Sequence, residues 1–156
     1  MIYSRKPKDF KNELEIASCF LEYDGKMLLL HRADHLPQGN TWASPAGKIE
    51  SSETPIQAVI REVLEETSFA ILHEKDLLYL GKVYVRYPDL KFVHHMFRLG
   101  LDYQPKILLS HEHKDFNWVT PAEALKMDLI PDQDNCIRLF YKLPPSFPRR
   151  RESREK

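Results

Sequence analysis

The sequence predicts one domain of the α/β (α+β) class, in which strand-like segments lie before and after an amphipathic helix. Its 156 residues are enough for a single domain with a sizeable core. Apolar residues alternate in several segments that short turns join, which is typical of strands. A Thr-Pro capping pattern opens one stretch that has the apolar period of a helix.

The first two strands are expected at residues 13–23 and 26–33. Asp24-Gly25 between them is the dipeptide most typical of a two-residue type I′ turn, so the pair should form a hairpin. Residues 34–53 are rich in Gly, Pro, Asn and Ser and should form a loop with at most short extended pieces.

The helix should begin at Thr54, because Thr54 and the Pro-Ile-Gln that follows have the spacing of a capping box. Apolar residues then recur at helical spacing and form a stripe that faces a core: Ile56, Val59, Ile60, Val63 and Leu64. Beside this stripe, Glu62, Glu65 and Glu66 share a sector about 100° wide. Neighbouring carboxylates on a helix repel by roughly 0.2–0.5 kcal/mol per pair, so their presence needs a physical reason.

Further elements are expected towards the C-terminus. Strands are predicted at residues 77–87, 91–101, 105–110 and 114–119, and a turn joins the first two. A short helix should begin at Thr120, and another should span residues 136–143.

The charge of the chain is unevenly distributed. A basic segment at 1–12 and a Pro- and Arg-rich, flexible tail at 144–156 flank a domain expected at 13–143, whose centre is acidic although the formal net charge is zero. An acidic centre does not suit direct nucleic-acid binding. No apolar run approaches the roughly 20 residues of a membrane span, and the N-terminus lacks the apolar region of a secretory signal. A cytoplasmic protein without nucleic-acid or membrane partners is expected, in which Cys19 and Cys136 are reduced core thiols.

One constellation of residues carries chemistry. Gly47 is followed after five residues by Glu53, and after seven more by the segment Arg-Glu-Val-Leu-Glu-Glu-Thr-Ser-Phe at 61–69. This spacing resembles the Nudix box of the Nudix hydrolases, and every specified position matches except Ser68, where the family has Gly. A residue with a Cβ costs roughly 1–2 kcal/mol in the left-handed conformation that such a glycine adopts. The residue at which the helix ends is therefore not predicted.

The resemblance implies the Nudix fold, a mixed β-sheet sandwiched between α-helices, and a divalent-metal site. Glu62 and Glu66 would be the main ligands of Mg²⁺ or Mn²⁺, and Glu65 would be a further ligand or the residue that activates water. The backbone carbonyl of Ala46 and the side chain of Glu112, from a later loop, would complete the ligand set.

The physical chemistry of the box agrees with this reading. Pyrophosphate linkages are polyanionic, so they repel a water or hydroxide nucleophile unless cations neutralise their oxygens. Mg²⁺ and Mn²⁺ prefer hard oxygen ligands, and a bound cation would remove the repulsion between the glutamates. Arg61 lies four residues before Glu65 and is expected to bridge back to Glu53, so both Arg61 and Glu53 are expected to orient the catalytic carboxylates.

Three residues are candidates for substrate binding. Arg32 is positioned to hold a phosphate by bidentate contacts, with a plain surface arginine as the alternative. Trp42 and Trp118 are candidates for stacking on a nucleobase, although packing in the core is the commoner role of tryptophan.

The predicted activity is hydrolysis of a phosphoanhydride in a nucleoside diphosphate linked to another group, with a nucleoside triphosphate, oxidised or not, as the first candidate. Residues 44–66 are similar to MutT-type enzymes, which hydrolyse oxidised guanine nucleoside triphosphates. Residues 109–125 are instead similar to asymmetric dinucleoside tetraphosphate hydrolases. A dinucleoside polyphosphate hydrolase and a non-catalytic, Nudix-like nucleotide sensor therefore remain as alternatives.

Overall fold

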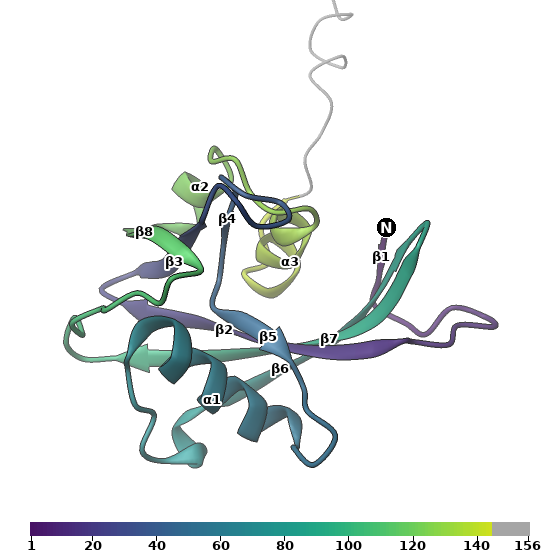
Figure 1. Ribbon diagram of the computed structural model, residues 1–156, viewed down its shortest axis with the longest axis horizontal. Coiled ribbons are helices and arrows are strands. Elements are labelled where there is room, and N and C mark those ends of the chain that lie inside the picture. Colours follow the sequence, from purple (N-terminus) through teal and green to yellow (C-terminus); the bar gives the residue numbers. More distant parts are fainter. Residues whose placement is uncertain (145–156) are drawn as a thin grey trace, which may run out of the picture.

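The computed structural model describes residues 1–144, and the rest of the predicted tail, residues 145–156, lies outside this part (Figure 1). Its strands are β1 (Ile2–Tyr3), β2 (Leu14–Tyr23), β3 (Lys26–Arg32), β4 (Trp42–Ala43), β5 (Ala46–Lys48), β6 (Leu78–Tyr87), β7 (Leu90–Leu101) and β8 (His113–Val119). Its helices are α1 (Pro55–Thr67), α2 (Pro121–Ala124) and α3 (Gln133–Phe140), with a 3-10 turn at Glu74–Asp76.

The strands form one mixed sheet in the order β1-β6-β7-β2-β3-β4, and β5 and β8 pair with β2 and β3. The central pair, β2 and β7, is parallel from Leu14 opposite Phe92 to Tyr23 opposite Leu101. The other pairs are antiparallel. Helix α1 covers one face of the sheet and α2 and α3 cover the other (Figure 1), which confirms the predicted mixed sheet between helices.

Both faces of the central strands are buried, as is usual where parallel strands are covered on both sides. Under α1, Ala17 and Cys19 of β2 pack in one cluster with Val59 and Val63 of the helix. On the opposite face, Phe20 packs in a second cluster with residues of α3. The two free cysteines lie one in each cluster, which agrees with the predicted core thiols, and burial raises the pKa of the Cys136 thiol to about 12.

The hairpin predicted at Asp24-Gly25 is confirmed, because both residues have the positive φ values of a type I′ turn, 53° and 75°.

The strand predicted at residues 105–110 is wrong. Its alternating apolar residues serve packing instead: Ile107 and Leu109 contact the cluster under α1, and the backbone there pairs with no strand in residues 1–144. The last helix begins at Gln133, three residues before the predicted start.

The capping box at the start of α1 is present, since the side chain of Thr54 accepts a hydrogen bond from Gln57 N and the side chain of Gln57 accepts one from Thr54 N. The predicted apolar stripe is correct except at Leu64, which is 48% exposed. The buried side of the helix instead includes Glu66 and Thr67, so its last turn directs a carboxylate into the protein.

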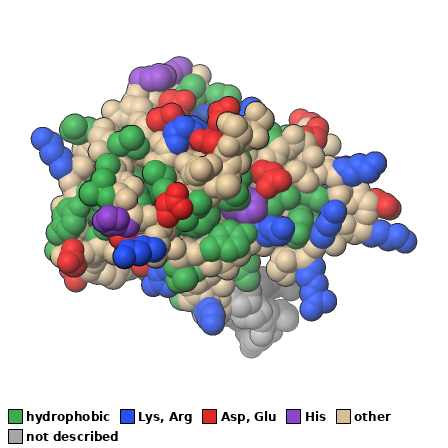
Figure 2. All heavy atoms as spheres, turned by 90° about the horizontal axis from the view of Figure 1, so that it is seen from below, with side chains coloured by type: hydrophobic (Ala, Val, Ile, Leu, Met, Phe, Trp, Pro, Cys, Tyr) green, Lys and Arg blue, Asp and Glu red, His purple; other side chains and the backbone are tan. Residues whose placement is uncertain are grey.

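The surface agrees with the uneven charge of the sequence. On the face covered by α1, Lys and Arg side chains gather towards the end where the N-terminal segment and the β6–β7 turn lie (Figures 1 and 2). Among residues 1–144, no helix combines the length and the apolar character that a membrane span requires.

Candidate active site

The short strand β5 brings Gly47 against the acidic side of α1. A Cβ built on Gly47 would lie 2.0 Å from the carboxyl carbon of Glu62 and 2.2 and 2.4 Å from its two oxygens. A Cβ at this position would require the Glu62 carboxylate to move, so the glycine allows the close approach of that glutamate.

Arg61 is the centre of an ion-pair network on the same helix. Its Nε and Nη2 donate to the two carboxylate oxygens of Glu53 at 2.6 and 2.9 Å. Its Nη1 donates to Glu62 at 2.7 Å and to Glu65 at 3.3 Å, and Nη2 also donates to the carbonyl of Lys48 at 2.9 Å. Hydrogen bonds from Arg61 and from the backbone of Glu50 lower the pKa of Glu53 to about 2. The guanidinium therefore links the loop before α1 to three box glutamates, as an orienting residue would.

Glu66 is the most buried of the three helix glutamates, at 6% exposure. One of its carboxylate oxygens accepts a hydrogen bond from the backbone N–H of Ala46 at 3.1 Å. Burial, followed by the charge of Glu62, raises the pKa of Glu66 well above its ordinary value, and the charge of Glu112 adds to this effect. Burial also raises the pKa of Glu62. The charges of Glu62 and Glu112 therefore both favour the protonated form of Glu66.

These residues fit a divalent cation, although they do not form a complete cage. Within residues 1–144, no three acidic, histidine or cysteine side chains are grouped closely enough to enclose a metal ion. Arg61 donates hydrogen bonds to carboxylate oxygens of Glu62 and Glu65. The pair Glu62 and Glu66 remains as two hard-oxygen donors whose buried charges lack full compensation, which is the chemistry that Mg²⁺ or Mn²⁺ would satisfy.

A cavity of about 270 Å³ lies between the sheet and the segment that leads into α3. Its wall is mostly apolar and includes Ile16, Val85, Phe92 and Ile130. Ala46 also lines this cavity, and its N–H is the group that binds Glu66. The cavity and the acidic cluster are therefore neighbours that share one residue of β5.

Two pairs of polar side chains stand in the wall of the cavity. His94 Nε2 and Ser18 Oγ are 2.8 Å apart, and Gln133 exchanges hydrogen bonds with the backbone N–H and the hydroxyl of Ser44 at 3.2 and 3.3 Å. Sequence reasoning missed these four residues. The available signal was weak: Ser18 lies inside the apolar run 16–21 and His94 follows the apolar pair Phe92 and Val93, but nothing in the sequence indicates that the two strands are neighbours.

The predicted substrate-binding residues are not part of this cavity wall. Trp42 stacks on His31 with ring centroids 4.2 Å apart, and Trp118 packs against the cluster under α1 with its indole N–H buried and unpartnered. Arg32 donates from Nε to the carbonyl of Pro37 at 2.6 Å. Their predicted contacts with substrate stay predictions.

Replacing Gly47 by Ala is expected to lower kcat/KM by about 100-fold, because the new methyl group must displace the Glu62 carboxylate by an ångström or more. The matched control is Gly100→Ala, where an added Cβ meets no atom within 4 Å. Steady-state kinetics of both variants, with urea unfolding to confirm folding, check this result. Equal activity of the two variants would show that the position of Glu62 is unimportant.

His94 is expected to make stability depend on pH. Burial lowers the pKa of His94 to about 4, below the value near 6.5 of the unfolded chain, so the unfolded chain binds more protons between these values. The stability due to neutral His94 is present above pH 6.5 and is lost as the pH falls to 4, by about 3 kcal/mol in total. Urea unfolding at pH 7 and pH 4.5 should show a smaller acid loss for His94→Gln than for the unchanged protein.

Known proteins resemble this chain over nearly its full length. It is 29% identical over 142 residues to the CTP pyrophosphohydrolase of Escherichia coli, covering 86% of this chain and 96% of that enzyme. It is 27% identical over 141 residues to the dihydroneopterin triphosphate diphosphatase of Haemophilus influenzae, covering 83% of this chain and 87% of that enzyme.

A solved structure shows the same arrangement of elements. The NUDIX domain of Shewanella oneidensis NrtR, complexed with ADP ribose, superimposes with a TM-score of 0.70 at 25% identity, covering 88% of this chain and 92% of that one. The family model for the NUDIX domain matches residues 13–140, which include the whole box, every strand of the sheet except β1, and the cavity. The chain therefore belongs to the NUDIX domain family.

Proposed function

We propose that the protein hydrolyses a phosphoanhydride bond in a nucleoside triphosphate, with a divalent metal ion. The observation that carries this proposal is the position of Ala46, which lines a nucleoside-sized cavity and also binds Glu66 of the acidic cluster. A nucleotide whose nucleoside occupies the cavity would direct its phosphates past β5 to the glutamates.

The glutamates on α1 have different proposed roles, which follow from how exposed each side chain is. Glu62 and Glu66, the buried pair, would hold the metal ion, with the Ala46 carbonyl and Glu112 as further ligands. The ion, when bound, supplies positive charge that neutralises the phosphate oxygens and lowers the repulsion of the nucleophile. Glu65 is 57% exposed in its side chain and accepts the proton of the attacking water, while Arg61 and Glu53 keep the carboxylates in place. The oxygen of water bonds to phosphorus, and the P–O bond to the leaving phosphate breaks.

The size of the cavity favours one nucleoside over two. At about 270 Å³ it lies just below the range of roughly 300–1,000 Å³ that is usual for ligand sites. A dinucleoside polyphosphate would have to leave its second nucleoside outside. Two of the related proteins are named for triphosphate substrates, CTP and dihydroneopterin triphosphate, which agrees with this choice.

Arg32 remains the proposed phosphate ligand, since Pro37 holds only its Nε. The two buried, unpaired cysteines fit a reducing compartment, and we place the protein in the cytoplasm. The full set of charged box residues favours an enzyme over a nucleotide sensor, because binding alone does not require a metal cluster.

The test is incubation with ribo- and deoxyribonucleoside triphosphates, ADP-ribose and dinucleoside polyphosphates, with Mg²⁺, with Mn²⁺ and with EDTA. Chromatography of the products should show metal-dependent release of pyrophosphate or phosphate from a triphosphate. Turnover of dinucleoside polyphosphates alone would replace the triphosphate by the alternative substrate. Tight nucleotide binding without any product would identify a sensor.

A further inference from the structure

We propose that Ser68 is a positioning residue for the reaction, because its hydroxyl group ties the end of α1 to the loop that carries Glu112. The proposal rests on the proposed function, in which Glu112 is a metal ligand. It concerns the one box position at which this chain departs from the family pattern.

The backbone of Ser68 ends the helix as a glycine would. Ser68 has φ 67° and ψ 11°, in the left-handed region, and its N–H donates to the carbonyl of Leu64 at 2.9 Å. A glycine would adopt this conformation without the steric strain that a Cβ introduces. Helix termination alone therefore gives no reason for a serine here.

The hydroxyl supplies a contact that glycine lacks. Ser68 Oγ donates to the carbonyl of Leu108 at 3.1 Å, and Leu108 N donates to the carbonyl of Thr67 at 2.9 Å. Both backbone groups of Leu108 are thus bonded to consecutive residues at the end of α1. The bond from Leu108 N to Thr67 limits the distance of Leu108 from the helix. The bond from Ser68 Oγ to the Leu108 carbonyl also fixes the orientation of its peptide groups.

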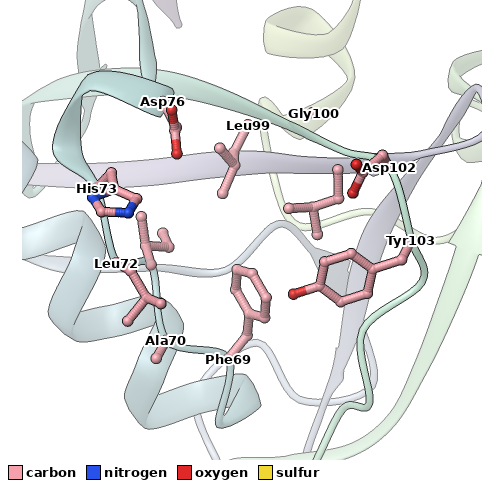
Figure 3. Close-up of a pocket in the computed structure, with 11 residues that line it drawn as sticks. Phe69, Ala70, Leu72, His73, Asp76, Leu99, Gly100, Asp102 and Tyr103 are labelled. Carbon is pink, nitrogen blue, oxygen red and sulfur yellow. The ribbon is translucent and has the colours of Figure 1, made fainter.

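Packing gives the first part of this loop little support. A groove of about 520 Å³ separates the segment that leaves α1, from Phe69 to Asp76, from the end of β7 and the start of the loop (Figure 3). The side chains of Phe69 and Tyr103 point into this groove from its two sides. Residues 102–104 of the loop are exposed, whereas Pro105 and Ile107 are buried, Ile107 in the cluster under α1. The bonds to Leu108 come directly after Ile107.

The part of the loop after Leu108 leads to Glu112 and is held at its far end. The carbonyl of Glu112 accepts a hydrogen bond from Ala33 N at 2.9 Å, and its N–H donates to Ser110 Oγ at 3.3 Å. The bond to Ala33 fixes the backbone of Glu112 beside the end of β3. Leu108 and Ala33 thus bind the backbone at the two ends of the segment that carries Glu112, the proposed metal ligand.

The test compares Ser68→Gly and Ser68→Ala with Ser52→Ala, an exposed turn serine, as the control. Gly relieves the strain and Ala retains it, but both lose the hydroxyl group. We expect both Ser68 variants to lower kcat and the affinity for Mn²⁺, measured by electron paramagnetic resonance, by about 10-fold, as losses of groups that support metal ligands do. KM should stay within about twofold, because the cavity lies on the opposite face of the sheet. Urea unfolding should show Ser68→Gly to be folded, which separates the effect from stability.

A double-variant cycle identifies the residue through which Ser68 acts. In a Glu112→Gln background, Ser68→Gly should cause no further loss of kcat or Mn²⁺ affinity. An equal 10-fold loss in that background would overturn the proposal, and so would a Ser68→Gly protein with unchanged kcat and Mn²⁺ affinity. If Glu112→Gln alone changes neither quantity, both the role of Glu112 and that of Ser68 are wrong. A protein that binds Mn²⁺ without hydrolysing any nucleotide would refute the proposed function, while the Mn²⁺ affinities would still decide the role of Ser68.

Discussion

Replacing Glu65 by Gln is expected to reduce kcat by roughly 10²–10⁴-fold, the usual contribution of a general base. The structural reason is the exposure of this side chain. Its 57% exposure contrasts with 14% for the side chain of Glu62 and with the buried position of Glu66, and Arg61 contacts it through one hydrogen bond of 3.3 Å. Of the three helix glutamates, Glu65 is therefore the one that can accept a proton from water outside the buried pair.

The matched control is Glu50→Gln. Glu50 also lies near Arg61, at 4.0 Å, and is 67% exposed in its side chain, but it is outside the box pattern. Initial rates under saturating substrate and Mg²⁺ should fall for Glu65→Gln and stay unchanged for Glu50→Gln. Undiminished turnover of Glu65→Gln would remove Glu65 from the mechanism.

Replacing Glu66 by Gln should have opposite effects on activity and on stability. Activity should fall by roughly 10²–10³-fold, the range for loss of one group that stabilises charge at the reaction centre. In EDTA, however, the variant should be more stable than the unchanged protein at pH 8, because it no longer buries a carboxylate beside Glu62. The hydrogen bond from Ala46 N is retained, since the amide oxygen of Gln accepts it equally well.

The pH dependence of this stability difference follows from the direction of the shift. The pKa of Glu66 is raised in the folded protein, so the folded state binds the proton more tightly than the unfolded state does. The contribution of Glu66 to stability is present below the unfolded pKa and is lost as the pH rises through the folded pKa. The gain of Glu66→Gln should therefore be largest at pH 8 and shrink towards pH 4.

Urea unfolding at several pH values in EDTA, with the exposed Glu74→Gln as control, measures this difference. Added Mg²⁺ should stabilise the unchanged protein and Glu74→Gln more than Glu66→Gln, because a ligand that binds the folded state stabilises it. Equal stabilisation of all three proteins would mean that Glu66 does not bind the metal.

The local features of the chain were readable from its sequence. Thr54 fixed the start of α1, Asp24 and Gly25 fixed the first turn, and the box spacing brought together Glu53, Arg61 and the helix glutamates. Each of these depends on residues close in sequence, whose geometry follows from one helix or one turn. Leu64 shows the limit of this reasoning. Its spacing places it in the apolar stripe of the helix, but spacing alone does not give the orientation in which the helix packs on the sheet, and Leu64 is exposed.

The cavity could not be predicted in this way. Ser18 and His94 come from strands that are far apart in sequence, and their contact depends on the parallel pairing of β2 with β7. Gln133 reaches Ser44 only because α3 lies over the same face of the sheet. The tryptophans were chosen for their chemistry alone, and the aromatic side chains that line the cavity are instead Tyr87, Phe92 and His94.

Because β2 and β7 are far apart in sequence, their pairing also causes a delay during synthesis, in which β2 lacks its parallel partner. Ser18 and Met96 are 78 residues apart but stand opposite each other, so β2 leaves the ribosome long before its partner has been translated. Until then one edge of β2 is unpaired and its face opposite α1 is uncovered, and exposed apolar surface of this kind is a natural substrate for chaperones. Chains that terminate before Leu101 should consequently be aggregation-prone, even though they contain every residue of the Nudix box.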